Sequence, residues 1–293
     1  MQWAARFVDS GCSPHPRIYN DAVQNNSLNI NTLNFLPQLV GENAGDPVVT
    51  IAVPNLNHGD FLERALVSIF AQEVPVEVMV LDGGSSDASL AVIQRWQSRL
   101  SYWRSHPDGG QAAAINEGIT RGSAPFVTWL NADDAYAPGG LRALVEAMAT
   151  HPGPAVVYGR GLFIDSADRV LGPYPTGAFN RAAFARRCTV SQPAALIRRS
   201  AWEQVKGLDT RYHLALDYDL WWRLANVDDG LKFTDSVVAM TRLHRGAKTL
   251  SQPYRHYREA MEIVRRHWGS TPMTWYLKLP VSVLARMLAR CYR

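Results

Sequence analysis

The sequence predicts an α/β fold, in which helices flank a mostly parallel sheet, followed by a mixed C-terminal half and C-terminal helices. Two observations lead to this fold class. In the first half, continuous apolar runs typical of fully buried strands alternate with segments whose apolar residues recur at helical spacing. Such repeated strand–helix units predict parallel strands joined by right-handed crossovers. In addition, polar residues directly follow three of the strands, as in open sheets that bind ligands at their carboxyl edge.

The first half contains the most regular strand–helix units. A β-branched strand over 48–53 ends at Pro54, and a helix follows from Phe61 to Phe70. The later units are a strand over 76–81 with a helix ending at Trp96, a short strand over 101–105, a helix over 111–119, and an apolar strand over 126–130.

The second half is expected to be less regular. A helix over 138–149 leads to a strand over 155–158, and 162–164 is expected to pair with 170–171 as a hairpin. The aromatic and apolar density of 214–225 is typical of a packed helix. Shorter elements are expected at 182–187, 194–197 and 201–205, with one or two strands within 231–243.

Composition and cysteine usage describe an ordinary globular protein, with 47% hydrophobic and 19% charged residues. Cys12, Cys188 and Cys291 match no metal-ligand spacing and favour a reducing compartment. Residues 1–46 are rich in Asn and are expected to form an N-terminal arm. No secretory leader is recognisable, and no apolar run reaches the ~18 residues needed to span a bilayer. We therefore expect a cytoplasmic location.

Positive charge is concentrated at the C-terminal end. Residues 242–293 hold eleven Arg or Lys against two Glu, a net charge of +9, whereas the whole chain carries +4. Two basic amphipathic helices are expected within 251–293, over 253–268 and 272–292. Their composition favours contact with the inner face of a membrane, and packing on the main domain is the alternative. No nucleic-acid motif accompanies the charge, so no nucleic-acid partner is expected.

Polar side chains follow three strands, at 54–57, 82–85 and 131–134. In a doubly wound sheet these segments meet at one edge. Acidic side chains there suit a nucleotide whose diphosphate carries a divalent cation, because Mg²⁺ and Mn²⁺ prefer carboxylate and phosphate oxygens. The alternative is that Asp133 or Asp134 only caps the next helix.

Six segments together resemble the family-2 glycosyltransferases, which have the GT-A fold, a Rossmann-like nucleotide-diphospho-sugar fold. The resemblance spans about residues 47–250 as one domain. The matching segments are Val53-Pro54, Leu81 to Asp87, Asp108 to Gly118, Leu130 to Asp134, Ser191 to Ala194 and Leu216 to Leu224.

The resemblance implies roles for individual residues. Asp82 is expected to recognise the nucleobase. Asp133 corresponds to the second acid of the DXD metal motif and, with His244, is expected to hold Mn²⁺ or Mg²⁺; the alternative for His244 is a surface histidine. Asn131 replaces the first acid of that motif. The residues expected to bind the nucleotide or donor sugar are Pro54, Asn55, Asp82, Gly83, Gln111, Asn116, Asn131 and Ala132.

Asp217 occupies the family's position for the catalytic base, although Leu216 replaces the Glu that usually precedes it. The resemblance implies an inverting hexosyltransferase with a nucleotide-diphospho-sugar donor, of which a UDP-sugar is favoured. The Gln-x-x-Arg-Trp signature of processive relatives is absent, so we expect transfer of a single sugar. The basic C-terminal region and the acceptors common in the family favour a lipid-linked glycan acceptor in surface polysaccharide assembly.

Other functions fit parts of the same pattern. A non-catalytic sugar-nucleotide or glycan-binding module would keep Asp82 and Asp133 without needing Asp217. A nucleotidyltransferase would need a Lys- and Gly-rich phosphate loop, and none lies within 48–66. The segment 82–85 lacks the G-x-G-x-x-G spacing of a dinucleotide-binding dehydrogenase.

Several neighbouring residues have alternative interpretations. Trp221 and Trp222 are expected to lie in the core rather than to stack on sugars. Asp219 is expected to be solvated or paired along its helix. Arg198 and Arg199 fit either contacts with an anionic acceptor or an exposed strand end.

Overall fold

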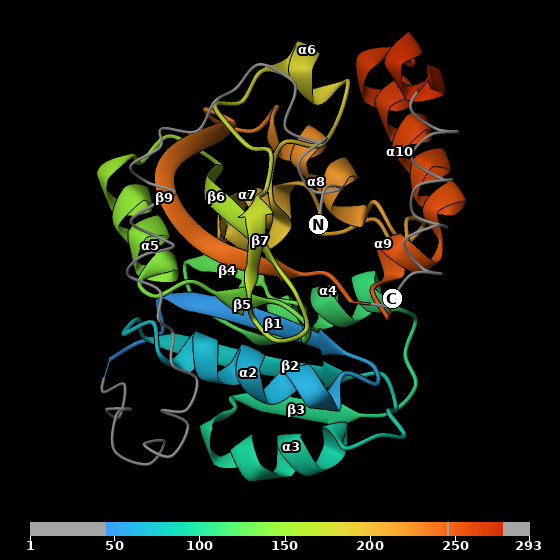
Figure 1. Cartoon of the computed structure of the whole chain (residues 1–293). Coiled ribbons are helices and arrows are strands. Elements are labelled where there is room, and N and C mark those ends of the chain that lie inside the picture. Colours follow the sequence, from blue (N-terminus) through green and yellow to red (C-terminus); the bar gives the residue numbers. More distant parts are fainter. Residues whose placement is uncertain (1–44, 245, 278–293) are drawn as a thin grey trace.

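The computed structural model describes residues 45–244 and 246–277 (Figure 1). Most of the expected N-terminal arm, and residues 278–293 of the expected last helix, lie outside the described residues. Among the residues that are described, no helix is long and apolar enough to cross a membrane.

The strand–helix repeat expected for the first half is confirmed. β1 pairs in parallel with both β2 and β4, and β2 pairs in parallel with β3. The elements are β1 (Val49–Asn55), α2 (Gly59–Phe70), β2 (Val76–Asp82), α3 (Ser89–Trp96), the 3₁₀ turn η3 (Gln97–Arg99), β3 (Tyr102–Ser105), α4 (Gln111–Arg121) and β4 (Phe126–Trp129).

The second half is mixed, as expected. Its strands extend the same sheet, whose order is β3-β2-β1-β4-β8-β6-β9-β5, with β7 paired to β6. The elements are β5 (Ala135–Tyr136), α5 (Gly140–Thr150), β6 (Val156–Ile164), β7 (Val170–Pro173), α6 (Arg181–Phe184), the 3₁₀ turn η4 (Gln192–Ala194), β8 (Ala195–Arg198), α7 (Arg199–Gln204), α8 (Leu216–Leu224), β9 (Leu231–Arg242), α9 (Lys248–Ser251) and α10 (Pro253–Trp268).

β6 is longer than the sequence indicated. The expected strands 155–158 and 162–164 form one continuous strand that includes Gly159 and Gly161. Both glycines allow close packing: a Cβ at Gly159 would lie 2.6 Å from the Ser236 carbonyl oxygen, and one at Gly161 would lie 2.5 Å from Ser191 Oγ. The glycines therefore serve the approach of neighbouring strands and loops, and they do not interrupt the strand.

The sheet separates two hydrophobic cores, because successive side chains of a strand point to opposite faces. Ile51 and Val53 of β1 pack in the core that contains residues of α2, α3 and α5. Ala52 packs in the other core, with residues of α4, α8 and α10. Trp221 and Trp222 of α8 are fully buried there, which confirms them as core residues. The helices cover the two faces of the sheet, so the loops that follow β1, β2 and β4 lie at its carboxyl edge (Figure 1).

Candidate active site

Two of the expected polar strand ends meet directly. The register of β1 and β2 places Asn55 beside Asp82, and Asn55 Nδ2 donates a 2.6 Å hydrogen bond to Asp82 Oδ1. Pro54 and Ala132 are also buried at this edge. Convergence of the strand ends therefore follows from the parallel register.

Asp82 is placed differently from our expectation of a nucleobase contact. Its side chain is fully buried and accepts hydrogen bonds from the Ser105 hydroxyl at 2.6 Å and the Ser85 amide at 2.9 Å. Burial alone would raise the pKa of Asp82, but the hydrogen bonds from Ser105 and Ser85 lower it. Asp82 thus holds the loop containing Gly83 as a buried anion, and its carboxylate is not available to a base in this conformation.

A chain of side-chain amides lies at the end of β4. Gln111 Nε2 donates to Asn131 Oδ1 at 2.7 Å, and Asn131 Nδ2 donates to Asp134 Oδ2 at 3.1 Å. Lys248 Nζ extends the chain by donating to Gln111 Oε1 at 3.0 Å. An amide at position 131 can both accept from Gln111 and donate to Asp134.

This arrangement explains why Asn131 is not an acid. Asp134 is buried, and burial together with the charge of Asp133 raises the pKa of Asp134 to about 8. A further carboxylate at position 131 would face Asp134 at hydrogen-bond distance and add repulsion.

Asp133 lies in a cluster with two imidazoles. Its Oδ2 is 2.9 Å from His244 Nε2, and one ligand atom each from His58, Asp133 and His244 lie within 4.8 Å of one another. Burial would raise the pKa of Asp133, but the hydrogen bond from His244 and the charge of His58 lower it. Burial lowers the pKa of His58, although the charge of Asp133 opposes that shift.

These three side chains fit a divalent cation. Two ligands at right angles, each about 2.1 Å from an ion, are about 3.0 Å apart, close to the separation of Asp133 Oδ2 and His244 Nε2. Phe61 and Gly246 pack against the imidazoles: the Phe61 and His244 ring centroids are 4.8 Å apart, and a Cβ on Gly246 would lie 3.1 Å from the His244 ring. The described residues therefore contain a plausible ligand set of two nitrogens and one carboxylate.

His58 was missed by sequence reasoning. The signal was present, because His58 follows the polar end of β1 and so had to lie near the carboxyl edge. Its loop is held by Asn57, whose φ of 57° lies in the left-handed region that Asn tolerates. Asn57 Oδ1 accepts from the Ser86 amide at 2.9 Å, and Gly59 N donates to Asp87 Oδ2 at 2.8 Å.

Arg242 was also missed, and it orders the segment that contains Asp133 and Asp134. Its side chain is fully buried, and Nε donates to the Asp133 carbonyl oxygen at 2.8 Å. The Arg242 amide donates to Asp134 Oδ1 at 3.0 Å, and the guanidinium also pairs with Asp168. Because Arg242 ends β9, this strand brings the following His244 to the carboxylates.

Asn116 does not join the site. Its amide group pairs with both backbone groups of Leu208, donating to the carbonyl oxygen at 2.9 Å and accepting from the amide at 2.9 Å. The expectation that Asn116 contacts the ribose or donor sugar stays a prediction, and such a contact would require this pairing with Leu208 to break. The side chain connects α4 to the loop after α7 because that loop offers it a complementary donor and acceptor.

Asp217 lies half-buried in the first turn of α8. Burial raises the pKa of Asp217 to about 6, which suits a group that accepts a proton near neutral pH. The charge of Asp217 also contributes to the raised pKa values of Tyr174 and Cys188, whose main cause is burial. These two side chains therefore lie in the electrostatic environment of Asp217.

The N-terminal end of α8 is held by α10. Glu259 Oε2 accepts from the backbone amides of His213, Leu214 and Ala215 at 3.0, 2.8 and 3.2 Å. Glu259 Oε1 also accepts from Arg255 Nε at 3.1 Å. A carboxylate at this end of a helix is favoured by the helix dipole, so α10 fixes the segment that precedes Asp217.

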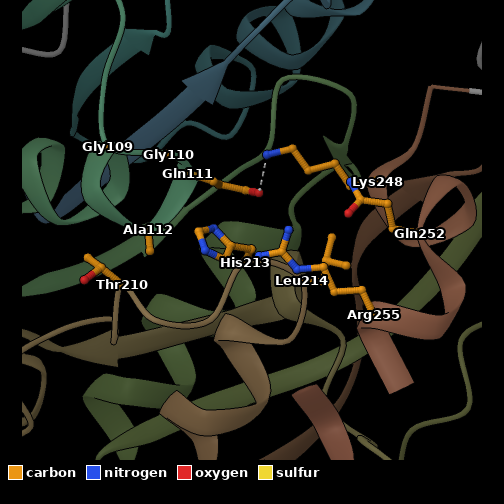
Figure 2. A pocket seen from close by; sticks show the side chains of 10 residues that line it. All are labelled: Gly109, Gly110, Gln111, Ala112, Thr210, His213, Leu214, Lys248, Gln252 and Arg255. Carbon is orange, nitrogen blue, oxygen red and sulfur yellow. Dashed lines mark hydrogen bonds between the residues drawn. The ribbon is translucent and has the colours of Figure 1, made fainter. Parts of the chain in front are cut away.

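A pocket lies between the beginning of α4 and the elements α8, α9 and α10. Figure 2 shows Lys248 and Gln111 joined across it, with His213 and Arg255 nearby. Partial desolvation lowers the pKa of Lys248, while the charges of Asp133 and Asp108 raise it, so this pocket adjoins the acidic edge. The lining residues are Gly109, Gly110, Gln111, Ala112, Thr210, His213, Leu214, Lys248, Gln252 and Arg255.

Three other charged residues have structural contacts. Asp219 is fully buried and paired with Arg223 of its own helix and with His267, so it is paired along its helix as expected but is not solvated. Arg198 donates to the carbonyl oxygens of Pro154, Met148 and His151, and Arg199 donates to those of Ala124 and Ile119. Both guanidinium groups are therefore engaged by backbone carbonyl oxygens of neighbouring helices and loops.

Comparisons with known proteins agree with this architecture. The family model described as "Glycosyl transferase family 2" matches residues 50–205, slightly more than half of the chain. An uncharacterized glycosyltransferase of Mycobacterium tuberculosis (strain H37Rv) is 30% identical over 185 residues, which cover 62% of this chain and 70% of the relative. Chondroitin synthase of Pasteurella multocida is 25% identical over 188 residues, covering 62% of this chain and 19% of the synthase.

Two solved structures share the fold. S. aureus TarS (residues 1–349), in complex with UDP-GlcNAc, has a TM-score of 0.62 at 15% identity and covers 82% of this chain and 72% of that one. The mannosyltransferase PcManGT from Pyrobaculum calidifontis, in complex with GDP-Man and Mn²⁺, has a TM-score of 0.58 at 17% identity and covers 93% and 80%. From its family match and its sheet, this chain belongs to the family-2 glycosyltransferases and has the GT-A fold.

Proposed function

We propose that this glycosyltransferase is a metal-dependent, inverting enzyme that transfers a single hexose from a nucleotide-diphospho-sugar to an acceptor hydroxyl. The observation that carries the proposal is the cluster of Asp133, His244 and His58 at the end of β4. A cation there would have one carboxylate and two imidazole ligands, and the sugar would enter the pocket lined by Gln111 and Lys248. TarS and PcManGT, which share the fold, were each solved with a nucleotide sugar. A UDP-sugar is the favoured donor.

The donor would lie along the carboxyl edge. Asn55 and the Gly83 backbone would flank the nucleobase, with Asp82 beneath them as the group that orders the loop. The hydrogen bond between Gln111 and Asn131 would break, and both side chains would then contact the ribose or the donor sugar. The diphosphate would lie near Asp133.

Asp217 would act as the general base. Its carboxylate removes the proton from the acceptor hydroxyl as that oxygen attacks the anomeric carbon of the donor. The bond between the anomeric carbon and the diphosphate oxygen breaks in the same displacement, so the configuration inverts and no covalent enzyme intermediate forms. The raised pKa of Asp217 supports this role near neutral pH.

Leaving-group charge would be stabilised by Lys248, which lines the pocket. Lys248 begins α9, four residues after His244, and its ammonium already reaches across to Gln111. Moving from that neutral partner to a phosphate oxygen would give a charge-assisted hydrogen bond. The metal, held by Asp133 and His244, would supply Lewis-acid stabilisation of the diphosphate.

The acceptor is proposed to be a lipid-linked glycan of surface polysaccharide assembly, met at the inner face of the membrane. Residues 273–277 are helical, and Met273, Tyr276 and Leu277 are 71%, 52% and 69% exposed. Trp275, by contrast, is buried and donates to the Ala185 carbonyl oxygen at 2.8 Å. This anchoring would hold the exposed apolar side chains at a membrane surface near the basic α10.

The test is release of nucleoside diphosphate and transfer of sugar from a panel of UDP-, GDP- and dTDP-sugars, with the metal supplied or chelated. Metal-dependent release that disappears in Asp217→Asn, with donor binding retained, would support an enzyme of this kind. Binding of a nucleotide sugar without release, in the wild type and in Asp217→Asn alike, would favour the non-catalytic binding module instead.

A further inference from the structure

Of the three side chains in the cluster, only Asp133 belongs to the six segments that resemble the family, and His58 was not expected from the sequence. His58 lies in the loop between β1 and α2, whereas Asp133 follows β4 and His244 follows β9. We propose that His58, Asp133 and His244 form a resident site for a divalent transition-metal ion, which the protein holds without a nucleotide and which discriminates against Mg²⁺. The inference rests on the same three side chains as the proposed function but can fail independently of it.

The number of protein ligands supports binding of the ion in the absence of a nucleotide. A cation held by one or two carboxylates completes its coordination with phosphate oxygens, so it binds well only with the nucleotide. Metal sites that hold their ion before the substrate arrives have three protein ligands and leave further coordination positions open. His58 raises the ligand number from two to three here.

The ligand types are the basis for selectivity. Mg²⁺ prefers oxygen ligands and gives up its water molecules reluctantly. Imidazole nitrogens suit Fe²⁺, Co²⁺ and Zn²⁺, and two imidazoles with one carboxylate are a recurring set for such ions. With two of three protein ligands being nitrogen, we expect Co²⁺ and Zn²⁺ to bind far more tightly than Mg²⁺, with Mn²⁺ between them.

The ligands are held in place before any ion binds. The left-handed Asn57 and its hydrogen bond to Ser86 fix the backbone directly before His58. On the opposite side, the buried Arg242 binds the Asp133 carbonyl oxygen and precedes His244 by two residues. The His58 and His244 ring centroids are 5.4 Å apart with their planes nearly perpendicular. Ligands fixed by separate contacts need little reorganisation to bind an ion.

Co²⁺ is the probe of choice because its visible absorption reports its ligands. The full chain, treated with a chelator and freed of nucleotide, is titrated with Co²⁺. We expect one equivalent to bind, a tenfold or larger excess of Mg²⁺ to leave the spectrum unchanged, and Zn²⁺ to displace the Co²⁺. His58→Ala should weaken Co²⁺ binding at least tenfold without nucleotide and alter the absorption bands. His58→Asp should bind Mg²⁺ more tightly than the wild type does.

The matched control is His151→Ala. His151 is an exposed imidazole at the end of α5, bonded to the Ala147 carbonyl oxygen, so its loss should leave the Co²⁺ titration unchanged. Thermal unfolding of the metal-free variants separates a ligand effect from misfolding, and a His58→Gln variant replaces His58→Ala if the latter unfolds. Unaltered Co²⁺ binding in the His58 variants, or no binding by nucleotide-free wild type, would overturn the proposal.

The two proposals give different outcomes. Sugar transfer by a protein that takes up its metal only with the nucleotide would preserve the proposed function and reject the resident site. Conversely, His58-dependent Co²⁺ binding by a protein that transfers no sugar from any donor would reject the function and keep the site.

Discussion

Two aspartate–histidine pairs among the described residues have nearly equal lengths but very different surroundings. Asp133 Oδ2 and His244 Nε2 are 2.9 Å apart at the carboxyl edge of the sheet, and Asp219 Oδ1 and His267 Nε2 are 2.8 Å apart between α8 and α10. Asp219 is fully buried, its other oxygen accepts from Arg223 at 2.7 Å, and the His267 ring stacks on Trp222. Asp133 instead has a second imidazole beside it and retains 17% side-chain exposure.

The difference shows that a short Asp–His contact does not by itself define a site. In the Asp219 pair both carboxylate oxygens are bonded to cations or potential cations within the core, so the pair can only join helices. In the Asp133 pair the second partner is another potential metal ligand, and Lys248 and the pocket adjoin it. The first pair is therefore expected to govern stability and the second to govern activity.

The largest expected effect is that of Asp133→Asn. Removing the only carboxylate of the cluster should lower sugar transfer by ~10³-fold or more, because single metal or oxyanion contacts contribute about this much. Nucleoside-diphosphate binding, measured by calorimetry, should lose its dependence on metal. Asp235→Asn, on the exposed face of β9, serves as the control. Full activity of Asp133→Asn would contradict the assignment of this pair.

Asp217→Asn comes next, because burial raises the pKa of the Asp217 carboxylate although hydrogen bonds from the backbone amides of Tyr218 and Asp217 oppose that shift. Loss of the proposed base should reduce turnover by ~10²-fold or more, with little change in donor affinity. The wild-type rate should fall as pH drops below about 6, where Asp217 becomes protonated. The remaining activity of Asp217→Asn should lack this decline. A wild-type turnover rate in the variant would mean that another residue is the base.

Stability should respond to pH with opposite signs at Asp219 and Asp217. Burial would raise the pKa of Asp219, but His267 and Arg223 lower it. The ionised Asp219 therefore stabilises the fold at pH values above the pKa of the unfolded state, and this stabilisation is lost as the pH falls through the pKa of the folded state. Asp219→Asn should therefore cost about 3 kcal/mol at pH 7 and less at pH 3. The Asp219 variant is consequently unsuitable as a neutral control for activity.

For Asp217, the folded pKa of about 6 lies above the unfolded value, so ionisation disfavours folding as pH rises from about 4 to above 6. Asp217→Asn should then stabilise the protein by about 1–2 kcal/mol at pH 7.5 and have almost no effect at pH 4. Urea unfolding at the two pH values measures both variants. If Asp217→Asn and Asp219→Asn changed the free energy of unfolding in the same direction at neutral pH, the proposed difference between the two acids would be wrong.

The smallest expected effect concerns the membrane. Truncation after Ser270 removes the exposed Met273, Tyr276 and Leu277 and leaves both aspartate–histidine pairs intact. Flotation with liposomes should depend on anionic lipid, weaken with salt and decrease on truncation, since each basic residue near the surface adds about 1 kcal/mol. Soluble-acceptor activity should change little. Undiminished flotation of the truncated protein would exclude this segment as the membrane contact.

The sequence by itself determined the order of strands and helices in the first half, because hydrophobic periodicity is a local property that burial on one or both faces imposes. It also determined that Asn55, Asp82 and Asp133 follow strand ends, and parallel register then had to bring them to one edge. The position of Asp217 one residue beside the apolar stripe of α8 was likewise readable from spacing.

Only the tertiary structure decided which polar groups bond to which. Asp82 and Asn116 are equally polar in the sequence, yet one is buried under its own loop and the other binds the backbone of Leu208. Arg242 and His244 reach Asp133 because β9 pairs with β5, which begins directly after Asp134, and no local sequence pattern reports a contact over that separation in the chain. Side-chain partners across such long separations depend on packing and desolvation, which are properties of the folded whole.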